Sequence, residues 1–225
     1  MYPISLNIKG KLCVVIGGGN VAERKVLSLL KAHACVRIIS PQLTLMLSEL
    51  AANNALDWRN RGYQTGDLEG ALLIFAATNN RKIQESVVRD AEQTGQLINV
   101  ADAPDLCDFQ VPAVVQRENL NLTVSTNGAS PALAAKIRLE LEEKYGEEYA
   151  ILLRLMSRIR KQLCKDSSST YTERKIVFQN ILHEDIIHWI RGEQWEQLSQ
   201  HLKTVLGPNT HFNLLELIEK EIKSS

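Results

Sequence analysis

The sequence predicts an α/β protein with an N-terminal parallel sheet, a short middle segment and a C-terminal helical domain. Strand-like apolar runs alternate with helical patterns as far as Val100, a strictly alternating strand follows at Leu120–Val124, and helical patterns fill the chain from Glu147 onward. Strands that alternate with helices of about ten to fifteen residues indicate a parallel sheet. The expected boundaries are residues 1–112 for the first domain, 113–146 for the middle segment and 147–225 for the helical domain.

A glycine-rich loop lies between the first predicted strand, Leu12–Ile16, and a helix expected to run to about Ala34. Gly17, Gly19 and Ala22 fill the fixed places of the pattern G-x-G-x-x-[GA]. In this pattern the first glycine allows a tight turn, the second lets a pyrophosphate approach the backbone, and a small third residue lets helix and strand pack closely. The helix N-terminus supplies N–H donors to the phosphates. We therefore predict a Rossmann-type domain that binds a dinucleotide; the alternative is a tight turn without a ligand.

The alternation continues through the rest of this domain. Further strands are expected at Val36–Ile39, Leu56–Trp58, Ala71–Ala77 and Leu97–Val100, and helices at Leu43–Ala52 and Arg81–Thr94, the last with Ile83, Val87, Val88 and Ala91 inward. Ligands of such sheets bind beyond the carboxyl ends of the strands. The glycine loop, residues 76–80 and residues 99–104 should therefore meet at one edge.

The residues after the second strand leave the choice of dinucleotide open. Many dinucleotide-binding folds carry an acid there to bind the ribose hydroxyls, but this chain has Ser40 and Pro41. Ser40 is a candidate for a hydrogen bond to the ribose, and Arg37 is a candidate for accommodating a 2′-phosphate. Neither NAD nor NADP is selected by these residues.

Asp102 follows the strand Leu97–Val100 at the predicted ligand edge. A carboxylate in this place is suited to proton transfer. An aspartate two residues before Pro104 is equally suited to an Asx-turn or a cap. Position alone leaves both interpretations open.

The middle segment predicts a strand of a different kind and a second possible anion site. Leu120–Val124 alternates between apolar and polar residues, as a half-buried strand does, and has no obvious partner in the parallel sheet. This favours a homodimer, most simply a two-fold one. Ser130 and Pro131 then form a good helix start, with the helix expected through Lys144. The N-terminus of that helix is either an anion site or only a well-capped helix start.

The helical domain carries an apolar and a basic face on its first helix, Tyr149–Leu163. The apolar face comprises Ile151, Leu152, Leu155, Met156, Ile159 and Leu163, and the basic stripe comprises Arg154, Arg158, Lys161 and Lys165. Such a stripe is commonly only a solvated face. After a loop at Asp166–Thr170, further helices are expected at Tyr171–His183, Asp185–Arg191, Gln194–Leu206 and Asn213–Lys223.

Composition excludes several classes of protein. The net charge is +0, which gives no global field for binding nucleic acid. The four cysteines form no C-x-x-C, and the histidines form no pair at metal-ligand spacing, so we expect reduced thiols, no disulfides and no metal site. No secretory signal or membrane-spanning run is apparent, so a cytoplasmic protein is predicted.

Over about residues 1–145 the motifs resemble the precorrin-2 dehydrogenases of siroheme synthesis, the stand-alone form of the N-terminal part of siroheme synthase. The resemblance rests on residues 1–4, on the loop within 14–25, on 99–104, on Phe109 and Pro112, and on 124–131. It implies NAD-dependent oxidation of precorrin-2 to sirohydrochlorin by a homodimer whose middle segment makes the dimer contact. It also places the family's essential aspartate at Asp102, and Thr126 where some members carry a serine that can be phosphorylated.

Sheet-edge position and the resemblance together give the expected site. The cofactor-binding residues are Gly17, Gly18, Gly19, Asn20, Val21, Ala22, Ser40, Pro41, Ala77, Thr78, Asn99 and Val100. Precorrin-2 bears many carboxylates, and its expected contacts are Thr126, Asn127, Gly128, Ser130, Arg154 and Arg158. Asp102 is the expected catalytic base.

Three alternatives stay open at this point. Some members of the family also insert ferrous iron into sirohydrochlorin, although little such activity is expected here because no imidazole or thiolate cluster is evident near the sheet edge. An NAD-sensing regulatory module would share the glycine loop without needing Asp102. An oxidoreductase of an unrelated small substrate is the third.

Overall fold

The computed structural model describes residues 1–165 and 170–207 of the chain. The chain folds as two compact units, the first comprising Met1–Val111 and the second beginning at Pro112. Within the described residues, no helix is long and apolar enough to cross a membrane.

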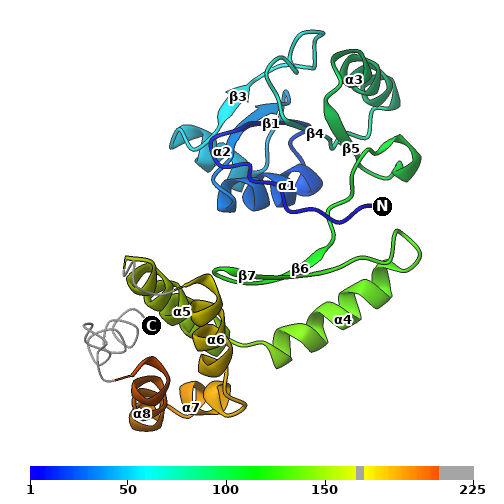
Figure 1. The fold of residues 1–225 in the computed structure, drawn as a ribbon. Helices are drawn as coiled ribbons and strands as arrows, with labels where there is room; N and C mark the ends of the chain where they lie inside the picture. Colours follow the sequence, from blue (N-terminus) through cyan, green and yellow to red (C-terminus); the bar gives the residue numbers. More distant parts are fainter. Residues whose placement is uncertain (166–169, 208–225) are drawn as a thin grey trace. The chain divides into compact units, whose positions relative to one another are not determined.

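The first unit is built on a five-stranded parallel sheet with the order β3-β2-β1-β4-β5 (Figure 1). The strands are β1 (Leu12–Ile16), β2 (Cys35–Ile39), β3 (Asp57–Arg59), β4 (Leu73–Ala76) and β5 (Leu97–Val100). The chain winds outward from β1 in one direction and then returns to its other side with β4. This reversal between β1 and β4 is the point where ligands of open α/β sheets bind.

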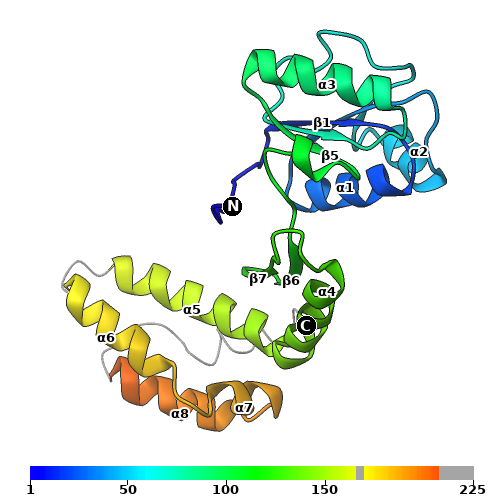
Figure 2. The same cartoon turned by 90° about the vertical axis from the view of Figure 1, so that its right-hand side faces the viewer.

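Helices cover both faces of this sheet. Helices α1 (Asn20–Lys31) and α2 (Leu45–Ala52) lie on one face and α3 (Arg81–Thr94) lies on the other (Figure 2). Alternate residues of β1 therefore enter different cores: Val15 packs with the side of α1, and Val14 with the side of α3. Burial on both faces explains why these strands are continuous apolar runs.

The structure confirms the predicted class and most of the predicted boundaries in this unit. β1, α3 and β5 have the predicted bounds, and β2, β3, β4 and α2 differ by one or two residues. The predicted end of α1 at Ala34 is wrong. The helix ends at Lys31, because Ala32 caps it and His33 takes a φ of 58°, which turns the chain into β2.

The second unit begins with an antiparallel hairpin of β6 (Ala113–Arg117) and β7 (Leu120–Val124). The predicted alternation in β7 is confirmed, with Asn121 and Thr123 exposed between half-buried apolar residues. As expected, this strand has no partner in the parallel sheet; it pairs along its full length with β6 in a separate two-stranded sheet. Helix α4 (Pro131–Lys144) packs on the hairpin, which supplies the additional packing that a two-stranded hairpin needs.

The rest of the described chain forms a helical bundle of α5 (Glu148–Lys165), α6 (Tyr171–Ile181), α7 (Ile186–Arg191) and α8 (Trp195–Leu206). Its core contains Leu155 and Ile159 of α5, Ile181 of α6 and Leu202 of α8, as the predicted apolar face of α5 required. An ion pair between Glu148 and Arg191 joins α5 to α7. The helix expected at Asn213–Lys223 and the loop residues 166–169 lie outside the described residues.

Candidate dinucleotide and substrate site

The carboxyl ends of the central strands stand level with one another. Ile39 pairs with Ile16, Ile16 with Ala76, and Ala76 with Val100 in the parallel registers. The residue that follows each of β1, β4 and β5 donates its N–H to the last residue of the adjacent strand. These bonds are Gly17 N–H to Ile39 O (2.9 Å), Ala77 N–H to Ile16 O (2.8 Å) and Ala101 N–H to Ala76 O (3.0 Å). The glycine loop, Ala77–Thr78 and Ala101–Asp102 therefore follow one another along a single edge, as the sequence predicted.

The three glycines of the loop are needed for two different physical reasons. Gly17 has a φ of 117°, and a Cβ there would lie 2.1 Å from Ala77 O. At Gly18 a Cβ would lie 2.0 Å from Gln42 O. Beside Gly19 there is open space, and Gly19 is exposed at the start of α1. The first two glycines thus let neighbouring loops pack against this one, and the third leaves room in front of the helix for a ligand.

The N-terminus of α1 fits a pyrophosphate. Gly19 is the N-cap and no side chain caps the helix. The N–H groups of the first turn, which lack partners within any α-helix, are therefore left for an external acceptor. Ala22 is fully buried against the sheet, as the motif requires. Lys25 follows one turn later, with its Nζ 5.6 Å from the centre of the Phe75 ring; burial is the main cause that lowers its pKa.

Two side chains proposed for the ribose are already engaged elsewhere. Ser40 is only 7% exposed, and its hydroxyl donates to Gln42 O at 2.6 Å. Arg37 donates from Nε to Asp57 Oδ2 at 2.8 Å. The expectation that the Ser40 hydroxyl meets the ribose is therefore not supported, because the loop after β2 folds over Gly18 and buries it. The neighbouring Pro41 is exposed.

Asp102 stands free at the edge. It is exposed, has a φ of 59°, and its carboxylate makes no hydrogen bond or ion pair with any described residue. The 3-10 turn that follows, Pro104–Leu106, has Ala103 as its N-cap without a side-chain bond. Neither the Asx-turn nor the cap is formed, so the structural interpretation of Asp102 loses its support.

Two side chains that were not predicted from the sequence hold this edge. The amide Nε2 of Gln84, a buried residue on α3, donates to Thr78 O at 2.7 Å. Cys107 Sγ lies 3.1 Å from Val100 N. Gln84 shares a helical stripe with Val87 and Ala91, and this spacing is the one signal that would have revealed it. No local pattern marks Cys107.

The second predicted anion site is a well-capped helix start. Ser130 Oγ accepts a hydrogen bond from Leu133 N–H at 3.2 Å, and Thr126 Oγ1 accepts one from Ser130 N–H at 3.1 Å. Pro131 at the first helical position has no N–H. Most donors that an anion would use are thus satisfied within the loop. Asn127 and Gly128, both exposed and both with positive φ, form its tip.

The basic stripe of α5 is partly engaged within the second unit. Arg154 forms an ion pair with Glu118 in the turn between β6 and β7. Arg158 also has an interaction of its own, and Lys161 is exposed. The side chain of Lys165 lies outside the described residues. Arg154 therefore anchors the hairpin turn on α5, whatever else it contacts.

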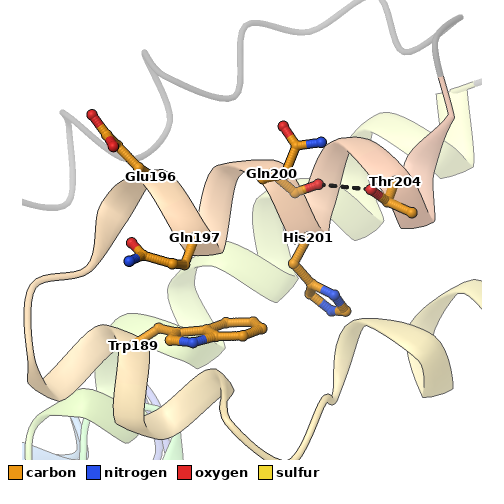
Figure 3. Close-up of a pocket in the computed structure, with 6 residues that line it drawn as sticks. All are labelled: Trp189, Glu196, Gln197, Gln200, His201 and Thr204. Atoms are coloured by element: carbon orange, nitrogen blue, oxygen red, sulfur yellow. Dashed lines mark hydrogen bonds between the residues drawn. The ribbon is translucent and has the colours of Figure 1, made fainter.

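The helical bundle contains an open hollow on α7 and α8, lined by Trp189, Glu196, Gln197, Gln200, His201 and Thr204 (Figure 3). The indole of Trp189 stacks on the imidazole of His183, with ring centroids 5.2 Å apart. His183 and its neighbours Glu184 and Asp185 are the one group among the described residues with three potential metal ligands close together, and all three are exposed. None of these residues belongs to the predicted site.

Comparison with known families gives the two parts of the chain separate matches. Residues 4–113 match the model of putative NAD(P)-binding domains, and residues 117–144 match the model of the central domain of sirohaem biosynthesis proteins. The chain is 35% identical over 204 residues to the siroheme synthase of Nitrosococcus oceani. Over these segments the chain is similar to siroheme synthases.

The relatives are longer than this chain. The match to the Nitrosococcus oceani protein covers 91% of this chain and 43% of that protein. A second siroheme synthase, from Methylococcus capsulatus, is 37% identical over 161 residues, which cover 72% of this chain and 34% of that protein. The chain thus spans less than half the length of these relatives.

Solved structures with the same fold include a dehydrogenase. SirC, a precorrin-2 dehydrogenase, superimposes with a TM-score of 0.74 at 24% sequence identity, and the match covers 89% of this chain and 100% of that one. The likeness confirms the predicted architecture of a parallel sheet followed by a helical region.

Proposed function

We propose that this protein catalyses the NAD-dependent dehydrogenation of precorrin-2 to sirohydrochlorin. The observation that carries the proposal is the free Asp102 carboxylate at the same sheet edge as the uncapped N-terminus of α1. The matches to siroheme synthases and to the fold of a precorrin-2 dehydrogenase support the choice of substrate.

The chain's residues divide the work between binding and proton transfer. The first-turn N–H groups of α1, with Gly17, Gly18 and Gly19, hold the pyrophosphate, while Pro41, Ala77, Thr78, Asn99 and Val100 line the rest of the edge. When bound there, NAD supplies a nicotinamide ring that accepts the hydride. The Asp102 carboxylate accepts or relays the accompanying proton from the substrate. The substrate thus loses one hydride and one proton.

The second unit supplies the remaining parts of the proposal. Residues 113–146 serve as a dimerisation and substrate segment, and residues from 147 onward as a helical domain. Val114, Leu133 and Leu139 leave 46%, 48% and 56% of their surfaces exposed on β6 and α4, and a two-fold homodimer would cover exposed apolar side chains of this kind. The tip at Thr126–Ser130 and the stripe at Arg154 and Arg158 meet the substrate's carboxylates.

The dimer is tested by mass in solution. Light scattering at micromolar concentration should give twice the chain mass, and Leu133→Glu combined with Leu139→Glu should reduce it to the chain mass, because burying the new charges in the interface is costly. Glu at Leu182, which is 53% exposed on another part of the second unit, is the matched control. A wild-type mass equal to one chain would reject the dimer.

The reaction is tested by anaerobic turnover of precorrin-2, followed by absorbance. We expect one NADH for each sirohydrochlorin formed, and slower turnover with NADP. NAD binding without turnover would favour a regulatory module instead. Parallel reactions with Fe2+ or Co2+ show whether metal is inserted into the product. The four free cysteines agree with a reducing compartment, and we place the reaction in the cytoplasm.

A further inference from the structure

The short turn that carries Asp102 is held on both sides by side chains from other elements. Cys107 Sγ lies 3.1 Å from Val100 N and 3.3 Å from both Val100 O and Ala103 O. Gln84 Nε2 lies 3.5 Å from Ala101 O, in addition to its 2.7 Å bond to Thr78 O. The backbone is thus bonded immediately before and after Asp102.

The chemistry of the two groups suits this arrangement. A thiol is a weak donor and a weak acceptor, so Cys107 accepts from Val100 N–H while it donates to one of the two carbonyls. An amide NH2 has two donors, which Gln84 directs at two carbonyls from a position that is 7% exposed. Gln84 also joins the loop after β4 to the loop after β5, since Thr78 and Ala101 follow those strands.

The conformation of Asp102 needs such support. Its φ of 59° lies in the left-handed region, which is unfavourable for residues with a side chain and which aspartate tolerates better than most. Strained backbone of this kind persists where the surroundings determine it. Here the Asp102 side chain contributes no bond of its own, so the conformation is set by neighbours of the turn.

We propose that Cys107 and Gln84 are positioning residues that hold Asp102 in the orientation needed for proton transfer. The proposal rests on the dehydrogenase function proposed above. Neither residue touches the substrate in this account; each acts through the backbone that carries the carboxylate. The competing account is that Cys107 only fills space beside the apolar cluster of β4, β5 and α3.

The test combines steady-state kinetics with a double-mutant cycle. Cys107→Ala removes the sulfur, Cys107→Ser keeps a donor and an acceptor, and Gln84→Met keeps the shape without the donors. Cys35→Ser is the matched control, because Cys35 is a free thiol at the opposite end of the sheet, at the start of β2. Each change is made in wild-type protein and together with Asp102→Asn.

Positioning predicts a selective loss. Cys107→Ala should lower kcat about 10- to 100-fold, because a displacement of about 1 Å at the reacting centre costs up to about 100-fold, while the Kd for NAD stays within about threefold, or roughly 0.7 kcal/mol. Gln84→Met should lower kcat less, Cys107→Ser should recover most of the loss, and Cys35→Ser should change nothing. In the Asp102→Asn background, Cys107→Ala should cost no further activity.

Two kinetic results would overturn the proposal. One is a Cys107→Ala loss that persists in full in the Asp102→Asn background; the other is an unchanged kcat in both Cys107→Ala and Gln84→Met. Amide hydrogen exchange of residues 100–103 gives a readout without turnover, and faster exchange in Cys107→Ala than in Cys35→Ser is expected. A wild-type protein that does not oxidise precorrin-2 would reject the proposed function, whereas unchanged exchange would reject the positioning.

Discussion

Helices α1 and α4 both begin after a strand and a short loop of small residues, yet their N-termini are finished in different ways. At α1 the N-cap is Gly19, no side chain bonds the first turn, and the space beside Gly19 is open. At α4 the N-cap is Ser130, which accepts from Leu133 N–H, and the first residue is a proline. The same sequence rule made both N-termini candidate anion sites, with a merely well-capped helix as the alternative at α4.

The difference shows when a helix N-terminus becomes a binding site. Every helix has unpaired N–H groups in its first turn, and either a ligand or a capping side chain satisfies them. Where the loop provides hydroxyls, as Thr126 and Ser130 do, the helix is stable without a ligand. Where the loop provides glycines, the first-turn N–H groups stay unpaired until a bound ligand accepts their hydrogen bonds. The comparison therefore predicts that changes at α1 mainly affect cofactor binding, and that changes at α4 mainly affect stability, with a smaller effect on the binding of the substrate.

The largest expected effect comes from the carboxylate beside α1, for which the α4 loop has no equivalent. Asp102→Asn should lower kcat by about 10²–10⁴, the usual contribution of a general base, and leave NAD affinity unchanged. Asparagine also tolerates positive φ, so the backbone is preserved. The reciprocal control is Asn127→Asp at the tip of the α4 loop, where φ is 50°.

The two substitutions are compared by kcat and by NAD affinity. Asn127→Asp should leave kcat and NAD affinity near wild type, while its charge, at the tip proposed to meet the substrate's carboxylates, should raise the KM for precorrin-2. An Asp102→Asn enzyme that keeps about a third or more of wild-type kcat would mean that the proton leaves by another route and that the edge beside α1 holds only the cofactor.

The next effect tests the uncapped state of α1 directly. Gly19→Asp should raise the Kd for NAD by about 100-fold or more, because like charges brought together in an interface cost several kcal/mol, and because aspartate would itself cap the helix. Gly19→Ser gives α1 the kind of cap that α4 has, without the charge, and should weaken binding less. Both proteins should fold, since a Cβ at Gly19 meets open space.

Isothermal titration with NAD and thermal melts measure the two properties together. Weaker binding with an unchanged or higher Tm is the expected pattern. Unchanged NAD affinity in folded Gly19→Asp protein would show that the glycine loop is only a turn.

A third prediction concerns the basic stripe next to the α4 region. Arg154→Gln together with Arg158→Gln should raise the KM for precorrin-2 roughly tenfold, because a hydrogen bond to a charged group contributes about 1.5–3 kcal/mol, and should leave NAD affinity alone. Arg154 also pairs with Glu118, so Glu118→Gln is the control that removes the ion pair and keeps the cation. Equal losses of Tm in both proteins, with KM unchanged, would assign the stripe to stability alone.

Much of the first unit was predictable because local patterns and one topological rule suffice for it. Apolar periodicity located β1, α3 and β5, and the rule that ligands bind beyond the carboxyl ends of parallel strands brought Gly17, Thr78 and Asp102 to one edge. These inferences need no knowledge of which side chains meet.

The errors arose where a side chain's role depends on a contact distant in sequence or on a folded loop. Ser40 was expected to face the ligand, but the loop that follows it closes over Gly18 and buries the hydroxyl. Arg154 finds its partner Glu118 thirty-six residues earlier in the chain. Cys107 reaches Val100 only because the turn at Pro104–Leu106 reverses the chain.

The smallest effect is expected at α4 itself. Ser130→Ala should lower the stability of the protein by about 1 kcal/mol, the usual cost of losing a serine N-cap, because Leu133 N–H loses its acceptor. NAD affinity should not change, and the KM for precorrin-2 should rise less than in the double arginine variant.

Ser130→Asp restores the cap and should restore Tm, while its charge would repel a carboxylated substrate. If Ser130→Asp has wild-type stability and a much higher KM, the α4 loop does meet the substrate, and a helix end that is already capped can still recognise an anion. If KM is unchanged in both, the cap is the whole role of this loop, and the binding of anions belongs to α1.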